Sequence, residues 1–351
     1  MQPGYREVVL PIRSRYLDVA RELLGSSIES LGFSRDHLFG YRRFLGEYYC
    51  FWLAEALGVT SYSLLEQSTI ATALARAYAV LVDAVIDEHR EDDSKLLAMA
   101  NALLRGSIDR FGKLVGDRDL IQNYTNGLLA QAEETERNEQ ERHWHKLQSF
   151  TASDMMTLGK KTSICFLPCI ALCLAAKRKD LIPSFISFIE ARNVAVQIRD
   201  DIADWREDVA RCNFTLPLTL SLQPREARHL SYVVQEDVAI NLYSNGVIDS
   251  LLHLSNQYLS NASCQIAKLF APLLKKYIDG LRRSNGEFLR RVESLRLSRH
   301  HVLTGDLVLS PAPWPAILEF PQSVRSRPMN VKEVAEWDNL ARKLHPRAGL
   351  T

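Results

Sequence analysis

Two aspartates stand one helical turn apart in the segment AYAVLVDAVIDEHREDD, where the residues before and between them are apolar. Asp83 and Asp87 are four residues apart, so both would lie on one face of a helix. An ionised carboxylate in apolar surroundings is costly unless it is paired or bound to a metal ion. We therefore interpret this pair as candidate metal ligands, and a solvated helix face is the simpler alternative.

A second acidic segment, NVAVQIRDDIADWREDVARCN, begins at Asn193. Its polar residues recur every three or four positions and form one helical face: Gln197, Asp200, Asp201, Asp204 and Asp208. A charged surface helix would show the same spacing, so this segment alone carries little weight. Two acid-faced helices in one largely helical chain, however, favour a shared site.

Facing acidic helices would form a cage of oxygen ligands, which Mg²⁺ prefers. Such ions are usually shared with substrate phosphate, and they neutralise the charge that builds on a departing group. Basic residues would complete a diphosphate clamp, and the candidates are Lys160-Lys161 and Arg42-Arg43. The residue types thus predict a metal-dependent site for a diphosphate.

The elements that must position these residues have helical periodicity almost throughout. Helices are expected near 4–24, 37–57, 62–90, 92–113, 117–146, 150–177, 179–210, 224–243 and 245–284, with a shorter one near 286–297. None of the 13 prolines lies between Pro11 and Pro168, and proline costs about 3 kcal/mol in a helix interior. We expect Pro168 to kink its helix. The prediction is an all-α fold, a single helical bundle.

The domain organisation follows from the same pattern. Residues 1–298 are expected to form one helical domain, which suits a chain of 351 residues. Residues 299–351 are rich in proline and are expected to form an irregular C-terminal extension.

Composition excludes several classes of partner. Lys plus Arg is 43 and Asp plus Glu is 42, a net charge of +1, which argues against a nucleic-acid binder. No uncharged apolar stretch reaches the roughly 20 residues of a membrane span. The six cysteines show no paired spacing typical of a zinc site. With no signal segment apparent, we expect a cytoplasmic protein without an integral membrane segment.

These motifs resemble those of the class I isoprenoid synthases. Asp83-Ala-Val-Ile-Asp87 resembles the first aspartate-rich motif of trans-prenyl diphosphate synthases and terpene synthases, with Ala84 in place of its second aspartate. Gln197-Ile-Arg-Asp200-Asp201-Ile-Ala-Asp204 resembles the second motif of the prenyl synthases, and Lys161-Thr162 resembles their lysine–threonine pair. The resemblance covers roughly residues 36–220.

The resemblance implies a helical fold around a deep apolar cavity, in which Mg²⁺, three ions in the family, holds an allylic prenyl diphosphate. It also implies a homodimer. The implied metal ligands are Asp83, Asp87, Asp200, Asp201 and Asp204. The implied catalytic residues are Asp83, Asp87, Asp200 and Lys161, and the implied substrate-binding residues are Arg42, Arg43, Arg76, Lys161, Thr162 and Gln197. We add Tyr78, an aromatic residue near the first motif, and Cys165, on the Lys161 face of its expected helix, as candidates that line the cavity.

Departures from the pattern favour a prenyl-synthase-like terpene synthase. The arginine pair that follows the first motif in prenyl synthases falls on Asp92-Asp93-Ser94, and two carboxylates there would repel a second diphosphate. The family's basic motif is reduced to Gly40-Tyr41-Arg42-Arg43, and Arg76 stands where the family has a histidine. We therefore expect the enzyme to ionise one allylic prenyl diphosphate and to rearrange or cyclise the carbocation.

Other functions are open on the sequence. A trans-prenyl diphosphate synthase would use Arg42, Arg43 and Arg76 to rebuild the site for isopentenyl diphosphate, and a head-to-head condensing enzyme is a looser match. A di-iron bundle needs two Glu-x-x-His motifs, and the chain has one, Glu226–His229. In a non-catalytic helical scaffold the acidic faces would be surface only.

Overall fold

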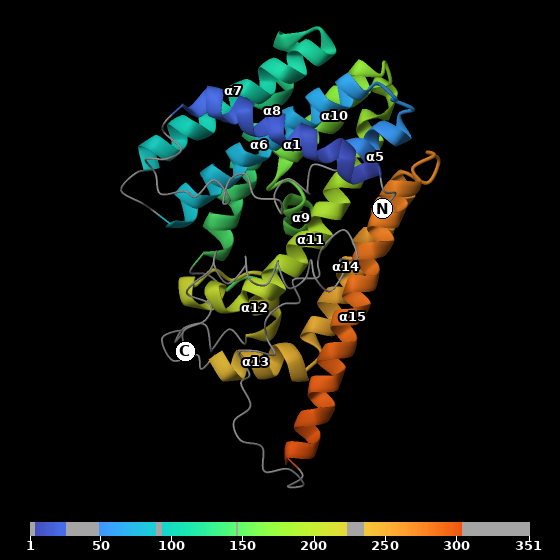
Figure 1. The fold of residues 1–351 in the computed structure, drawn as a ribbon. Helices are drawn as coiled ribbons and strands as arrows, with labels where there is room; N and C mark the ends of the chain where they lie inside the picture. Colours follow the sequence, from blue (N-terminus) through green and yellow to red (C-terminus); the bar gives the residue numbers. More distant parts are fainter. Residues whose placement is uncertain (1–3, 26–48, 89–92, 145–146, 223–234, 304–351) are drawn as a thin grey trace.

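The structure, a computed structural model, describes residues 4–25, 49–88, 93–144, 147–222 and 235–303 (Figure 1). Within these ranges the regular structure is helical, apart from an isolated bridge between Trp144 and Asn213. The expected all-α class is confirmed. None of the described helices is long and apolar enough to cross a membrane.

The helices follow one another from α1 to α15. Their bounds are α1 Gly4–Leu24, α5 Tyr49–Ala56, α6 Tyr62–Glu88, α7 Asp93–Val115, α8 Arg118–His143, α9 Ala152–Leu158, η2 Ser163–Phe166, α10 Leu167–Ala175, η3 Lys179–Leu181, α11 Ile182–Arg211, α12 Leu216–Ser221, α13 Gln235–Ser244, α14 Val247–Gln265 and α15 Pro272–Leu303. The expected boundary at residue 298 falls inside α15, and residues 304–351 lie outside the described ranges.

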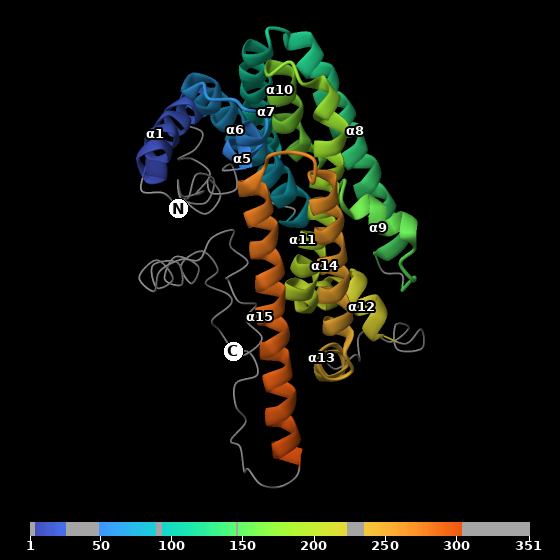
Figure 2. The same ribbon diagram turned by 90° about the vertical axis from the view of Figure 1, so that its right-hand side faces the viewer.

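The bundle has two ends joined by long helices. Helices α1, α6, α7, α8 and α10 gather at one end, while α12 and α13 lie at the other (Figures 1 and 2). Helices α11, α14 and α15 connect the two ends and pack in sequence, α11 against α14 and α14 against α15. The short 3-10 helix η2 packs against α6, α8 and α11, so the turn before it adjoins both helices that carry the acidic segments.

Buried side chains form three apolar clusters. The largest surrounds α10, whose residues from Leu167 to Cys173 are all buried, and a helix that is apolar on every side is a core helix. A second cluster joins α11 to α12 and α14 around Trp205. The third packs α1 on α6 and α7. Together they anchor the apolar faces of α6 and α11 and so set the direction of their polar faces.

The expected helix over 150–177 is wrong, because the structure divides it into α9, a turn, η2 and α10. Pro168 is the second residue of α10 and does not kink a longer helix. The first turn of a helix needs no hydrogen bond from the proline nitrogen, so proline is tolerated there. Lys161 and Thr162 consequently lie in a turn and not within a helix.

The expected helix over 245–284 is also wrong. It is two helices, α14 and α15, separated at residues 266–271, and the short helix expected over 286–297 is part of α15. Pro272 is the first residue of α15, where its fixed backbone angle suits a helix start. Of the helix expected over 37–57, the structure describes α5 alone.

Candidate active site

Helix α11 presents exposed and buried carboxylates from one acidic face. Asp200 and Asp204 are exposed, whereas Asp201 is buried. The opposite face is anchored by Ile198 and Trp205, both almost completely buried in the core. This anchoring fixes which way the acidic face points.

Asp200 lies among charged groups of both signs. Loss of surrounding water, together with the neighbouring carboxylate of Asp204, raises the pKa of Asp200 to about 6. The guanidinium groups of Arg192 and Arg199 oppose this increase in the pKa. Two exposed carboxylates that repel each other are a favourable pair of oxygen donors for a hard divalent cation.

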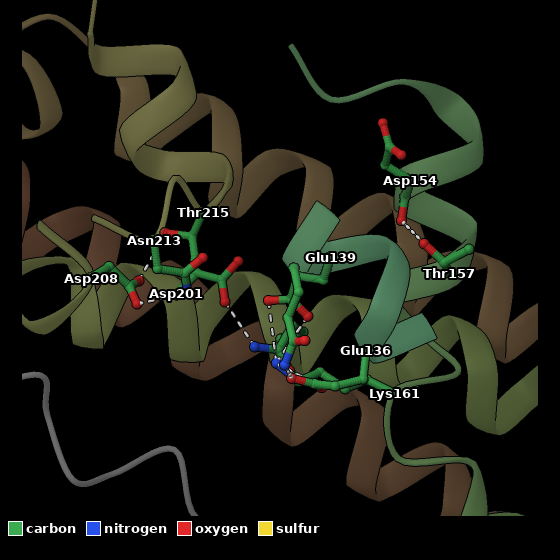
Figure 3. Close-up of polar contacts among 11 residues, drawn as sticks. Glu136, Glu139, Asp154, Thr157, Lys161, Asp201, Asp208, Asn213 and Thr215 are labelled. Atoms are coloured by element: carbon green, nitrogen blue, oxygen red, sulfur yellow. Dashed lines mark hydrogen bonds and ion pairs between the residues drawn. The ribbon is translucent and has the colours of Figure 1, made fainter. Parts of the chain in front are cut away.

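Asp201 faces the interior. Gln197 Nε2 donates a hydrogen bond to Asp201 Oδ1 at 2.7 Å, and Figure 3 shows the carboxylate pointing from α11 toward Glu139 on α8. Burial raises the pKa of Asp201 well above its ordinary value, although Gln197 and Lys161 lower it. The bond from Gln197 occupies Oδ1 alone, so burial is what distinguishes Asp201 from the exposed Asp200 and Asp204.

Asp208 closes the acidic face near the end of α11. It is buried and accepts hydrogen bonds from Thr215 Oγ1 at 2.8 Å and Asn213 Nδ2 at 3.3 Å (Figure 3). Burial raises the pKa of Asp208 to about 7, while the bond from Thr215 lowers it. Asp208 therefore joins α11 to the segment leading into α12.

Lys161 is held by two glutamates of α8. Its Nζ lies 3.2 Å from Glu139 Oε1 and 3.0 Å from Glu139 Oε2, and 3.8 Å from Glu136 Oε2 (Figure 3). Burial alone would lower the pKa of Lys161, but the carboxylates of Glu139 and Glu136 outweigh burial and raise it. The ammonium is therefore charged and paired before any substrate binds.

The turn that carries Lys161 is fixed from two sides. Asn193 Nδ2 on α11 donates to Gly159 O at 3.3 Å and to Thr162 Oγ1 at 3.1 Å. Ser163 Oγ donates to Leu128 O on α8 at 2.7 Å. The Thr162 side chain is exposed. Hydrogen bonds to both α8 and α11 thus hold the lysine–threonine pair between these helices.

The short helix before this turn is itself tied to α8. Thr151 caps α9 in a reciprocal arrangement with Asp154, a common stabilising start for a helix. Asp154 also forms an ion pair with Arg142, near the end of α8. The chain from α8 to Lys161 therefore folds back on α8, which brings the lysine to the glutamates.

Residues 77–88 of the first acidic segment form the last turns of α6, so the expected helix around Asp83 and Asp87 is confirmed. The side chains of Asp83 and Asp87 lie outside the described residues. Arg76 is half-buried on the same helix. Tyr78 packs against two core clusters, and burial, with the charge of Glu133, raises its pKa.

The predicted arginine pair and the predicted cysteine are the remaining candidate binding groups. Arg42 and Arg43 lie outside the described residues. Cys165 is half-buried beside the largest core cluster, and Cys169 and Cys173 are inside it. All six cysteines are free, and burial raises the pKa of Cys173 to about 12. These cysteines act as core residues, the simpler interpretation of their spacing.

Sequence reasoning missed several partners of the site. Arg192 donates to Tyr277 Oη from Nε at 2.8 Å and from Nη2 at 2.6 Å, and Trp52 packs on the Tyr277 ring with centroids 4.9 Å apart. Glu136 and Glu139 belong to a polar stretch of α8 that is typical of a solvated face. No local signal identifies these residues, because their partners lie on other helices.

The donor set fits Mg²⁺ in part. Asp200 and Asp204 offer exposed oxygens, but no three His, Cys, Asp or Glu side chains within the described ranges lie close enough to hold a metal ion. A cation at this face would therefore need further oxygen ligands. Asp83, Asp87 and the phosphate groups of a substrate are the candidates.

Comparisons with known proteins relate the fold to solved structures. No protein-family model matches the chain, and no curated protein does. A heptaprenyl diphosphate synthase from Staphylococcus aureus matches with a TM-score of 0.64 and 16% identity over 82% of this chain and 99% of that one. A geranylgeranyl pyrophosphate synthase from Lactobacillus brevis matches at 0.63 and 18%, over 81% and 96%.

A third match is a decaprenyl diphosphate synthase from Rhodobacter capsulatus, with a TM-score of 0.60 and 14% identity over 80% of this chain and 98% of that one. Identities this low concern the fold alone. The chain therefore has the all-α fold of the class I isoprenoid synthases, as its motifs predicted.

Proposed function

We propose that the chain is a Mg²⁺-dependent enzyme that ionises an allylic prenyl diphosphate. The observation that carries the proposal is the packing of η2, which begins two residues after Lys161, against α6 and α11. A fixed cation adjoining two acidic helices suits a diphosphate that binds together with metal ions. The fold shared with prenyl diphosphate synthases supports the same substrate class.

In this proposal Asp83, Asp87, Asp200 and Asp204 hold Mg²⁺, three ions by resemblance to the family. Bound ions would supply Lewis-acid stabilisation of the diphosphate leaving group. Asp201, also predicted as a ligand, would join them through Oδ2, since the bond from Gln197 uses Oδ1.

The protein's own groups orient the substrate. Lys161 would donate hydrogen bonds to the diphosphate oxygens that gain the electron pair when the allylic carbon–oxygen bond breaks. The exposed Thr162 hydroxyl and the Gln197 amide offer further donors. Tyr78 and Cys165 would border the prenyl chain, where apolar walls exclude water from the cation.

We further propose that the cation is captured by isopentenyl diphosphate, so that the enzyme is a trans-prenyl diphosphate synthase. The names of the matched structures support this outcome over cyclisation. Arg42, Arg43 and Arg76 would bind the second diphosphate. The allylic carbon would bond to the double bond of isopentenyl diphosphate, which then loses a proton.

Cyclisation of a single substrate is the second candidate, and Asp92-Asp93 is the observation that favours it. Two carboxylates after the first motif would repel a second diphosphate. Ala84 marks a further departure from the prenyl synthases. The product would then be a hydrocarbon or alcohol formed by a terpene synthase.

One experiment separates the two outcomes. The protein is incubated with Mg²⁺ and allylic diphosphates of different chain length, with and without isopentenyl diphosphate, and the products are identified by mass spectrometry. A longer diphosphate formed only with isopentenyl diphosphate supports prenyl transfer. A hydrocarbon or alcohol formed without it supports cyclisation. Release of no diphosphate under any condition would refute the proposed function and favour the scaffold.

We also propose a homodimer, on the resemblance alone, and a cytoplasmic location, on the lack of paired cysteine spacing in the sequence. Light scattering coupled to size-exclusion chromatography tests the assembly, and a mass of one chain would refute it.

A further inference from the structure

Lys161 is paired with carboxylates of the protein itself. Both carboxylate oxygens of Glu139 lie within hydrogen-bonding distance of its Nζ, at 3.2 and 3.0 Å, and Glu136 adds an ion pair at 3.8 Å. The two glutamates are three residues apart on α8 and therefore share one face. Glu139 and Glu136 therefore already occupy the side of the Lys161 ammonium at which a diphosphate would bind.

The surroundings of Lys161 carry an excess of acidic groups. The side chains of Lys161, Glu136 and Glu139 keep 28%, 23% and 14% of their exposure, so solvent screens them only partly. Asp201 on α11 also acts electrostatically on this lysine. One ammonium against two glutamates leaves local negative charge, before Asp200 and Asp204 are counted.

This balance of charge works against a bare diphosphate. A diphosphate without cations would have to displace Glu139 from the ammonium and approach Glu136 at close range, and like charges brought together are strongly unfavourable. A diphosphate that carries divalent cations presents little net negative charge to the same glutamates. The glutamates therefore oppose the bare anion far more than the metal-bound one.

We propose that Glu136 and Glu139 determine the specificity of the diphosphate site, by holding Lys161 so that it accepts a diphosphate only together with divalent cations. This inference rests on the proposed function, because it assumes that Lys161 meets a diphosphate. It assigns a role to two residues outside both acidic motifs. The glutamates do not contact the reacting atoms in this role but act through Lys161.

The test is binding of inorganic diphosphate by isothermal titration calorimetry, in excess EDTA and in Mg²⁺. The wild type is expected to bind only with Mg²⁺. The E136Q/E139Q variant, which keeps side-chain size, is expected to bind metal-free diphosphate at least about tenfold more tightly than the wild type. The matched control is E141Q, which removes one charge from the exposed side of the same helix and should leave metal-free binding unchanged.

A third variant tests whether the gain runs through Lys161. K161Q/E136Q/E139Q is expected to lose the metal-free binding that the double variant gains. The inference is overturned if the double variant binds metal-free diphosphate no better than the wild type, or if its gain persists without Lys161. If the double variant fails to fold by circular dichroism, E139Q alone takes its place, since Glu139 makes the two shorter contacts.

Failure of this inference differs from failure of the proposed function. A wild type that binds no diphosphate even with Mg²⁺ contradicts the diphosphate-dependent function itself. A wild type that binds with Mg²⁺, together with a double variant that shows no metal-free gain, contradicts only the role of the glutamates. Retention of Mg²⁺-dependent turnover in the double variant would support their action on specificity and not on catalysis.

Discussion

At the scale of residues, the acidic face of α11 contains carboxylates with different environments. Asp200 is exposed and repelled by Asp204, while Asp201 and Asp208 are buried and hydrogen-bonded. Helical spacing alone places all four of these aspartates on one helix face and does not distinguish their roles. Their environments suggest that the exposed pair meets cations and that the buried pair joins α11 to its neighbours.

The exposed acids should control turnover. We expect Asp83→Ala and Asp200→Ala each to reduce Mg²⁺-dependent diphosphate release by about 10²–10³-fold, because each removes a proposed oxygen ligand. A colorimetric diphosphate assay measures this. Glu207→Gln is the control, since Glu207 is 70% exposed on the same helix and pairs only weakly, at 3.8 Å, with Arg211. Unchanged turnover in either alanine variant would contradict the assignment of these aspartates as metal ligands.

Asp208 should make stability depend on pH. Its pKa is about 7 in the folded protein against 3.8 ordinarily, so folding disfavours the ionised form. The ionised Asp208 carboxylate therefore lowers the free energy of unfolding. This destabilisation is absent below pH 4, grows as the pH rises, and reaches its full size above pH 7. Asp208→Asn should therefore raise the free energy of unfolding by about 1–3 kcal/mol at pH 8 and change it little at pH 4.

Thermal melts in EDTA at the two pH values measure this effect. Asn can keep the bond from Asn213 and donate to the Thr215 hydroxyl, so the geometry of the site tolerates it. Asp279→Asn is the control, because the Asp279 side chain is 63% exposed. Equal destabilisation by Asp208→Asn at both pH values would show that the ionised carboxylate is not the cause.

At the scale of elements, the turn between α9 and η2 decides where Lys161 lies. Asn193 holds this turn from α11, and the ion pair between Arg142 and Asp154 ties α9 to α8. The turn also approaches α11 very closely, since a Cβ at Gly159 would lie 2.7 Å from Glu190 O. A glycine is therefore required by close packing there and not by an unusual backbone angle.

Gly159→Ala should push the turn away from α11. We expect the free energy of unfolding to fall by about 1–3 kcal/mol. We also expect kcat to fall under conditions in which the variant is still fully folded, because Lys161 moves with the turn. Gly127→Ala on α8 is the control, since its Cβ would meet nothing within 4 Å and alanine favours the helix by about 0.5–1 kcal/mol. The two variants should therefore change the melting temperature in opposite directions.

At the scale of the whole molecule, three core clusters hold the described helices together. Their buried residues extend from Ile12 to Val292. Helix α15 continues to Leu303, beyond the boundary expected at residue 298. We propose that the helical domain ends with this helix and not before it.

A chain ending at Leu303 should therefore fold with a single cooperative transition. All buried residues of the three clusters are retained, so the free energy of unfolding should change by less than about 1 kcal/mol. Circular dichroism and thermal melts measure the outcome. Loss of the cooperative transition would show that residues 304–351 contribute to the core.

Local pattern accounts for the parts of this protein that were predicted correctly. Helical period and the lack of proline over a long stretch specify the all-α class, and they place both acidic segments in helices, α6 and α11. The helix boundaries near Pro168 and Pro272 were predicted wrongly, because a proline can kink a helix or stand in its first turn. The periodicity of the flanking residues is the same in both cases and cannot distinguish them.

What the sequence by itself determined is which residues can do chemistry: the aspartates, Lys161 and Gln197. Only the tertiary structure decided which of these charges meet. The partners of Lys161 lie on α8, 22 residues earlier for Glu139, and the close contact of Gly159 is with α11. Such pairings depend on how buried faces pack over long separations in the chain, whereas residue type and spacing encode only the face on which each side chain stands.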